Sequence, residues 1–307
     1  MAAAPVDLPG AVVPAVLTPV RADLAIDHDA FAEHCRWLLA HGCDGLAPMG
    51  TTGEANSFSV AERTEALERL VAAGVPAARM IVGVGCCAIP DTVALARHAV
   101  ELGVGGVLAL PPFYYKNVSD DGLYAAYDQV IQRVADARLR LYLYHFPQMS
   151  GVPLSRALVA RLRAAYPDTV VGLKDSSGDW DNMKALCEML PGFRVYAGTE
   201  RYLLALLRTG GAGTISSTVN VTCALAARVA ARPDAPEADA LQERLTAVRD
   251  AIERRPPAIP ALKRLVAERT GHEGWRYARP PHLPLDDERF AQVKAGLQAL
   301  DFALPGG

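Results

Sequence analysis

Several features that would place a chain of this size in another functional class are missing. The 307 residues carry 31 basic and 34 acidic side chains, a net charge of −3 at pH 7, so no strong field attracts nucleic acid or an anionic membrane. No apolar run reaches the roughly 20 residues that a membrane-spanning helix needs. No basic segment followed by an apolar one opens the chain, as a secretory signal would require. We therefore expect a cytoplasmic protein without nucleic-acid or membrane partners.

Metal-site and nucleotide motifs are missing as well. The six cysteines form no C-x-x-C pair and have no zinc-like spacing with histidine, which predicts free, mostly buried thiols and no metal site. The phosphate-binding pattern G-x-x-x-x-G-K-[ST] does not occur.

Lysine is scarce, which makes each lysine informative. Only five of the 31 basic residues are lysine: Lys116, Lys174, Lys184, Lys263 and Lys294. Lys174 lies in the apolar stretch VVGLKDS. We expect the other four to be solvated, Lys116 in a loop and the rest on helical surfaces.

Eight short segments rich in β-formers alternate with amphipathic helical stretches. Their first residues are on average about 29 positions apart, which is the length of one βα unit. The segments are nearly continuously apolar, as expected for strands covered on both faces. They are Val12–Val20, Gly45–Gly50, Arg79–Gly85, Gly106–Pro112, Arg140–Pro147, Val170–Ser176, Arg194–Gly198 and Ala212–Asn220.

This repeat predicts an α/β fold, a (β/α)8 TIM barrel over residues 1–221. No strand pattern follows Asn220, so residues 222–307 are predicted to form a helical C-terminal extension. A doubly wound open sheet is the competing architecture. Catalytic groups of such barrels lie at the C-terminal ends of the strands, so the residues at those ends are the candidates.

The second strand ends in Gly50-Thr51-Thr52-Gly53-Glu54. Glycines permit a tight turn, and the two hydroxyls with nearby backbone N–H groups fit a carboxylate or phosphate. A plain turn with a threonine helix cap is the structural alternative.

Lys174 ends the sixth strand. Burial lowers the pKa of a lysine, by up to 3–5 units when burial is complete, and a neutral amine can attack a ketone to form a Schiff base. The alternative is a structural ion pair with Asp175 or Glu54. One strand earlier, Tyr142 and Tyr144 share a face, and a tyrosine near a Schiff base could relay protons, although packing in the core is the commoner role. His145 points the opposite way and is expected to be packed or hydrogen-bonded.

Four motifs in order resemble the dihydrodipicolinate synthase / N-acetylneuraminate lyase family of pyruvate-type class I aldolases. They are G-T-T-G-E after the second strand, Y-x-x-P from Tyr144, G-x-K-[DE] around Lys174, and a glycine-rich turn leading to Ile215-Ser216. The resemblance extends from about Val12 to Leu300.

The resemblance implies specific roles. Lys174 would form the imine with C2 of a 2-oxo acid, and Tyr144 would shuttle protons. Thr51 and Thr52, with the turn amides that include Gly53, would hold the substrate carboxylate. Tyr114 matches a tyrosine that enters the neighbouring subunit's site and completes a relay with Thr51. The resemblance also implies a homotetramer, a dimer of dimers, that needs no cofactor other than the covalent imine.

Departures from the family pattern narrow the substrate. Dihydrodipicolinate synthases carry an arginine where this chain has Met149, which cannot make a bidentate carboxylate contact. The expected tail-binding positions are those that carry hydroxyls or follow the seventh strand: Ser176, Gly198, Glu200 and Ser217. Arg201 stands where the neuraminate lyases have an acid.

The sequence therefore predicts a Schiff-base lyase that acts on a 2-keto-3-deoxy sugar acid or related 4-hydroxy-2-oxo acid and releases pyruvate and an aldehyde. The alternatives are dihydrodipicolinate synthase, a keto-deoxy sugar acid dehydratase, and a non-catalytic 2-oxo-acid sensor.

Overall fold

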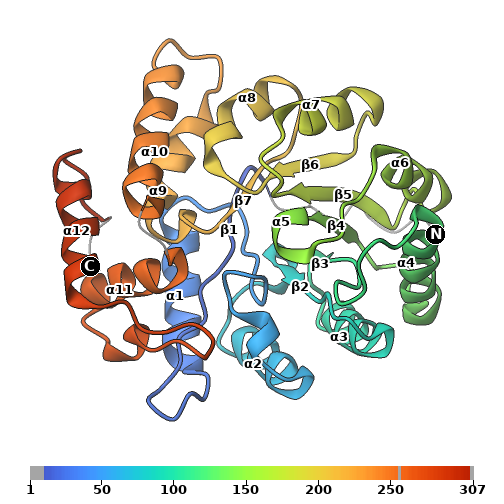
Figure 1. Ribbon diagram of the computed structural model, residues 1–307, viewed down its shortest axis with the longest axis horizontal. Coiled ribbons are helices and arrows are strands. Elements are labelled where there is room, and N and C mark those ends of the chain that lie inside the picture. The colour runs from blue at the N-terminus through green and yellow to red at the C-terminus, as the bar shows by residue number, and fades with distance from the viewer. Residues whose placement is uncertain (1–9, 255–256, 305–307) are drawn as a thin grey trace.

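The computed structural model describes residues 10–254 and 257–304. Within them, seven parallel strands form one sheet in the order β1-β7-β6-β5-β4-β3-β2. The strands stand in the middle of the molecule and helices surround them (Figure 1). The strands are β1 (Val12–Pro14), β2 (Ile81–Gly83), β3 (Gly106–Ala109), β4 (Leu141–His145), β5 (Val170–Asp175), β6 (Arg194–Ala197) and β7 (Gly213–Ser216).

The second expected strand, Gly45–Gly50, is reduced to two bridging residues. Ala47 pairs with Ala15 and Leu46 pairs with Met80, both in parallel. The Ala47 N–H donates to the carbonyl of Pro14 (2.8 Å), and the Leu46 N–H donates to that of Arg79 (2.9 Å). These bridges connect the two sheet edges, so the barrel prediction is confirmed and an open doubly wound sheet is excluded. The expectation of a full strand was wrong because Pro48 has no N–H to continue the ladder.

The helices of the described ranges follow the strands. They are α1 (His28–Ala40), α2 (Val60–Ala72), α3 (Ile89–Glu101), α4 (Asp120–Val134), α5 (Pro147–Ser150), α6 (Arg156–Ala165), α7 (Trp180–Met189), α8 (Leu203–Arg208), α9 (Val219–Ala231), α10 (Ala238–Glu253), α11 (Ala258–Thr270) and α12 (Asp287–Gln298). Side-chain caps begin several of them; Ser59 and Glu62 form a reciprocal capping box at α2. No helix among these residues is both long and apolar enough to cross a membrane.

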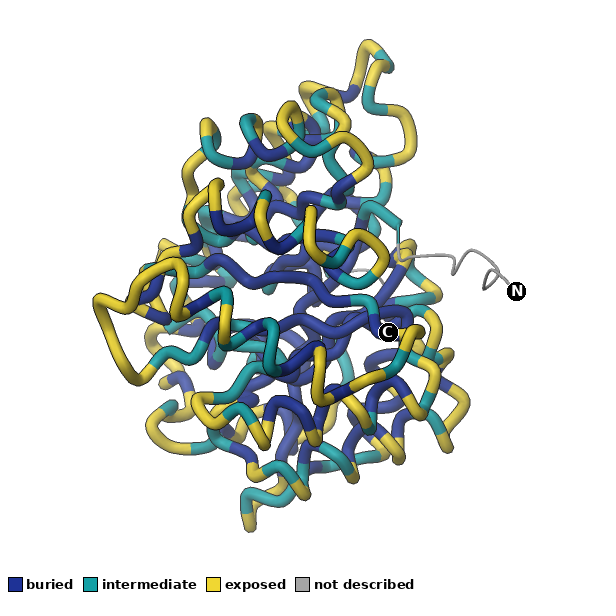
Figure 2. The backbone as a smooth tube through the Cα atoms, turned by 90° about the vertical axis from the view of Figure 1, so that its right-hand side faces the viewer, coloured by how far each residue is buried: buried dark blue, intermediate teal, exposed yellow. Residues whose placement is uncertain are grey.

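Two hydrophobic clusters hold the barrel. The inner one lies inside the ring of strands, and the larger outer one joins strands to helices. Figure 2 shows buried strands at the centre and exposed turns at the periphery. The inner cluster consists of Val13, Ala15, Ala47, Ile81, Leu108, Tyr142, Tyr144, Tyr196 and Ile215.

Helices α10, α11 and α12 form the C-terminal extension and stand together at one side of the barrel (Figure 1). The expected boundary after residue 221 falls inside α9, which is one continuous helix from Val219. The last strand is also shorter than expected, because β7 ends at Ser216 and not at Asn220. The chain therefore leaves the sheet earlier than its apolar composition indicates.

Candidate active site

Strands β4 and β5 position the two central candidates side by side. Their register pairs Tyr144 with Lys174 and His145 with Asp175. Because successive strand residues face opposite sides, the first pair faces the barrel interior and the second pair faces the helices. As expected, His145 is structural: its Nδ1 accepts the Leu154 N–H at 3.0 Å, and burial lowers its pKa.

Lys174 is buried but unpaired. The residue is only 5% exposed, and its Nζ lies 4.4 Å from the centre of the Tyr144 ring. Within residues 10–254 and 257–304, Lys174 makes no ion pair. Neither proposed structural partner reaches it. Asp175 accepts from the Asn182 amide (2.8 Å) and the Ser177 N–H (2.8 Å).

Glu54, the other possible partner, pairs instead with Lys263 of α11. Lys263 Nζ also donates to the carbonyl of Tyr277 at 2.9 Å, and the Arg279 N–H donates to Glu54 Oε2 at 2.9 Å. Lys263 is 1% exposed, so the expectation that it is solvated was wrong. Burial lowers its pKa, and the Glu54 carboxylate opposes that effect.

The Gly50–Glu54 turn brings its first threonine to the tyrosine. Thr51 Oγ1 lies 3.4 Å from the Tyr144 hydroxyl, and Thr52 is buried. The turn sits tightly on the barrel: a Cβ on Gly53 would lie 2.9 Å from the carbonyl oxygen of Val16. Glycine is therefore required there because of this close approach.

A cavity of about 420 Å³ opens over these residues. Seven of the predicted positions line it: Thr51, Thr52, Tyr144, Lys174, Ser176, Gly198 and Ser217. A Cβ on Gly198 would stand 2.0 Å from Ser176 Oγ, so the glycine keeps room for that hydroxyl. A groove of about 460 Å³ between α10 and α12 contains none of the predicted residues. The cavity over Lys174 is therefore the candidate active site.

Three predicted residues do not line this cavity. Gly53 lies behind it, where its carbonyl accepts from Thr18 Oγ1 at 2.9 Å. Tyr114 follows β3 and is 74% exposed. Glu200 was expected to bind substrate hydroxyls, but its side chain is fully buried and bound to protein groups.

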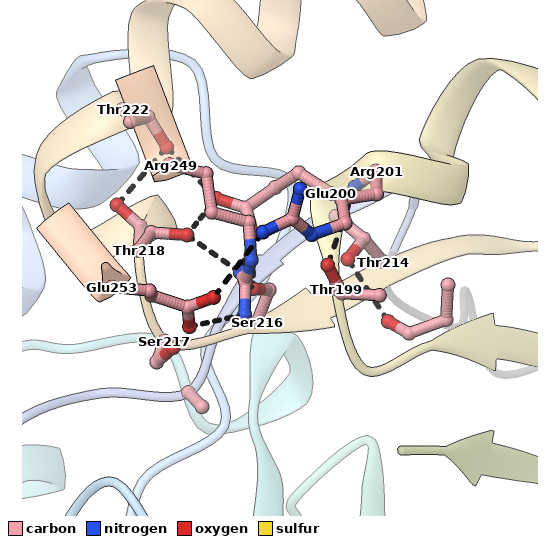
Figure 3. Close-up of polar contacts among 12 residues, drawn as sticks. Thr199, Glu200, Arg201, Thr214, Ser216, Ser217, Thr218, Thr222, Arg249 and Glu253 are labelled. Atoms are coloured by element: carbon pink, nitrogen blue, oxygen red, sulfur yellow. Dashed lines mark hydrogen bonds and ion pairs between the residues drawn. The ribbon is translucent and has the colours of Figure 1, made fainter. Parts of the chain in front are cut away.

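The Glu200 carboxylate is saturated by its neighbours (Figure 3). It accepts from the hydroxyls of Ser216, Thr218 and Thr222 and forms an ion pair with Arg249 of α10. Burial alone would raise the pKa of Glu200, but the guanidinium and the hydroxyls outweigh it, so the pKa lies below its ordinary value. A carboxylate held in this way has a structural role and is not available to a substrate.

Sequence reasoning missed the wall that α10 contributes. Arg249 and Glu253 both line the cavity, and the Arg249 Nη2 group pairs with Glu253. A signal was available. Arg249 lies among Leu245, Val248 and Ile252, on the apolar face of the helix, where an arginine needs a buried partner. Burial raises the pKa of Glu253 even though Arg249 acts in the opposite direction.

Comparisons with known proteins agree with this picture. Residues 8–300 match the dihydrodipicolinate synthetase family. The chain is 36% identical over 296 residues to an uncharacterized DapA-like lyase of Chloroflexus aurantiacus, covering 95% of this chain and 97% of that protein. A solved dihydrodipicolinate synthase from Agrobacterium tumefaciens is 34% identical with a TM-score of 0.87, covering 94% of this chain and 99% of that one. YagE, a prophage protein of the same family from E. coli K12 solved with pyruvate, is 25% identical with a TM-score of 0.86, covering 96% and 99%.

Proposed function

Because this chain belongs to the dihydrodipicolinate synthetase family and is a lyase, we propose that it is a Schiff-base aldolase that cleaves a 2-keto-3-deoxy sugar acid or related 4-hydroxy-2-oxo acid. The products are pyruvate and an aldehyde. The observation that carries the proposal is a buried amine, Lys174, that has no ion-pair partner in the described ranges and shares a cavity with a tyrosine and two threonines.

The first half of the reaction makes the imine. The Lys174 amine, in its unprotonated form, attacks C2 of the 2-oxo acid. Uptake of one proton then lets the C2 oxygen leave as water and gives a protonated imine. The hydroxyls of Thr51 and Thr52, at the mouth of the barrel, hold the C1 carboxylate. The imine is an electron sink that no metal or other cofactor need supply.

The second half breaks the C3–C4 bond. Tyr144 takes the proton from the C4 hydroxyl, and the bonding pair moves into the imine to give an enamine and a free aldehyde. A proton returned to C3 and hydrolysis of the imine then release pyruvate and the amine. Thr51 Oγ1, 3.4 Å from the Tyr144 hydroxyl, is placed to pass the proton onward.

Borohydride trapping tests this proposal. Reduction in the presence of pyruvate is expected to add one pyruvyl-derived mass, located on Lys174 by peptide mapping. Lys263 is an internal control: it is about as buried, but its amine is held in an ion pair with Glu54 and does not border the cavity, so it should stay unlabelled. An unmodified Lys174 after reduction of the wild-type protein would refute the proposal.

Dihydrodipicolinate synthase is the rival activity, because a solved structure with that name is 34% identical. Met149 argues against dihydrodipicolinate synthase activity. The side chain is largely exposed, at 63%, and offers no charge to a second carboxylate. An assay with pyruvate and aspartate semialdehyde separates the two, and we expect no condensation.

We also propose that the enzyme is a homotetramer in which Tyr114 completes a neighbouring subunit's site. Tyr114 and Tyr115 are 74% and 73% exposed on the loop after β3. Mixing inactive Lys174→Met subunits with Tyr114→Phe subunits should restore activity, because a mixed tetramer contains sites with both groups. Sedimentation checks the assembly; a monomer, or no recovery on mixing, contradicts the proposal.

A further inference from the structure

The orientation of the substrate follows from the positions proposed above for its C1 carboxylate and its C2 atom. With the C1 carboxylate at Thr51 and Thr52 and C2 on Lys174, the carbons beyond C4 must extend toward the remaining walls of the cavity. Those walls are formed by the ends of β5, β6 and β7 and by the C-terminal helices. The contributing residues include Ser176, Gly198, Thr199, Ser217, Arg249 and Glu253.

The charged groups on this wall are not equally available. Arg249 Nη1 donates to Ser216 Oγ and Thr218 Oγ1, both at 2.7 Å, and to the Glu200 carboxylate. Its Nη2 group pairs with Glu253. The guanidinium is thus engaged by protein on both terminal nitrogens, and it has little to offer a substrate anion.

Glu253 is in the opposite situation. Its Oε1 accepts from Arg249, while its Oε2 is 3.9 Å from Arg201 Nη2, beyond hydrogen-bond distance. The side chain is 27% exposed and borders the cavity, and Figure 3 marks an ion pair at each of its oxygens, Oε1 with Arg249 and Oε2 with Arg201. Because the Arg201 contact is longer than a hydrogen bond, Oε2 has no hydrogen-bond donor among the described residues and can accept one from a ligand. Arg201 itself pairs with Asp250.

The charge of this cluster is negative. Glu200, Arg249 and Glu253 carry one positive and two negative charges, which sum to −1. The Arg201–Asp250 pair adds nothing to that sum. A substrate tail that ends in a carboxylate or phosphate would therefore meet a like charge in a partly buried place, where screening is weak.

We propose that Glu253 is a specificity-determining residue, which accepts a hydrogen bond from a hydroxyl or ammonium group at the far end of the substrate and rejects an anionic end. This inference rests on the proposed function, since it assumes that C1 and C2 bind as described. It assigns the substrate to 2-keto-3-deoxy acids with a neutral hydroxylated or amino tail, and excludes those that carry a second carboxylate.

A competition experiment tests the assignment without requiring turnover. Two probes differ only in the tail: 2-keto-3-deoxygluconate ends in a hydroxymethyl group, and 2-keto-3-deoxyglucarate ends in a carboxylate. Each competes with pyruvate for borohydride trapping at Lys174, and the ratio of their competition constants is measured. We expect the wild type to favour the neutral tail by about tenfold or more, which corresponds to about 1.4 kcal/mol.

Glu253→Gln keeps the shape and an acceptor but removes the charge. It should reduce that preference by about tenfold, close to no preference. Glu243→Gln, at an exposed position of the same helix, is the matched control and should leave the ratio unchanged.

The outcomes separate the two proposals. A wild type that prefers the dicarboxylate, or a Glu253→Gln ratio equal to that of the wild type, overturns the role of Glu253 and leaves the imine chemistry intact. Absence of pyruvate trapping in the wild type overturns the proposed function and this inference with it.

Discussion

Two lysines of this protein are almost equally buried and differ in nearly everything else. Lys174, at the end of β5, is 5% exposed, borders the cavity and has no carboxylate partner in the described ranges. Lys263, on α11, is 1% exposed and holds Glu54 in an ion pair. Burial alone therefore does not mark a reactive amine. The absence of a counter-ion, together with access to a cavity, distinguishes a nucleophile from a structural cation.

The same substitution in both places should give opposite results. We expect Lys174→Met to reduce turnover at least about 10⁴-fold, because no other group can form the imine. Its stability in urea should equal or exceed that of the wild type, since a buried amine without an ion pair is costly to desolvate. Lys174→Arg should be as inactive, because a guanidinium stays charged. Measurable turnover in Lys174→Met would show that Lys174 is not the nucleophile.

Lys263→Met should cost about 3–5 kcal/mol in the free energy of unfolding, because it leaves the Glu54 carboxylate buried without its cation. The folded fraction should still trap pyruvate on Lys174. Urea denaturation followed by circular dichroism measures the loss.

Two variants control this experiment. Lys294→Met breaks an exposed pair with Glu268 (2.8 Å) and should cost no more than about 1 kcal/mol. The double variant Lys263→Met with Glu54→Gln should recover part of the loss, because no charge is left buried. An equal loss in the free energy of unfolding for Lys263→Met and Lys294→Met would show that the buried pair contributes no more to stability than an exposed pair.

Tyr144→Phe separates imine formation at Lys174 from cleavage of the C3–C4 bond. The amine remains, so pyruvate should still be trapped by borohydride. Cleavage should slow by about 10²- to 10³-fold, because the proton acceptor for the C4 hydroxyl is gone. Rapid-quench kinetics separate the two steps, and loss of trapping together with cleavage would assign Tyr144 to imine formation instead.

The smallest effect concerns a second, more exposed pair between the barrel and the extension. Hydrogen bonds from Arg279 lower the pKa of Glu62 to about 2 from 4.5. The stabilisation is present above pH 4.5 and is lost as the pH falls from there toward 2. Because Glu62 is 36% exposed, we expect no more than about 1 kcal/mol. Unfolding curves of Glu62→Gln should lie closer to the wild type at pH 2.5 than at pH 7; a constant gap would contradict this.

Features of the chain that repeat locally could be predicted from the sequence. Most strand positions, and the face shared by Tyr142 and Tyr144, follow from period and composition. The partner of a side chain depends on distant segments, and sequence periodicity does not identify it. Thus the sequence predicts that Glu200 binds substrate, whereas its carboxylate in fact pairs with Arg249, 49 positions further along the chain.

The sequence around Lys263 carries a signal for its burial. Lys263 is placed four residues after Ile259 and three before Val266, on the apolar stripe of α11. A lysine in that stripe predicts a buried partner, and Glu54 in the conspicuous turn was available. The pattern does not show which lysine, Lys174 or Lys263, pairs with Glu54, because that depends on how the C-terminal extension packs against the barrel.

That return has a consequence for how the chain can be divided. The carboxylate of Glu54 is accommodated only because an ammonium from α11 and an amide from residue 279 come back across more than two hundred positions to meet it. A truncated chain that stops after α9 would keep every strand and yet leave an anion stranded in an apolar setting. We therefore expect the ring of strands and the C-terminal extension to unfold as one cooperative unit.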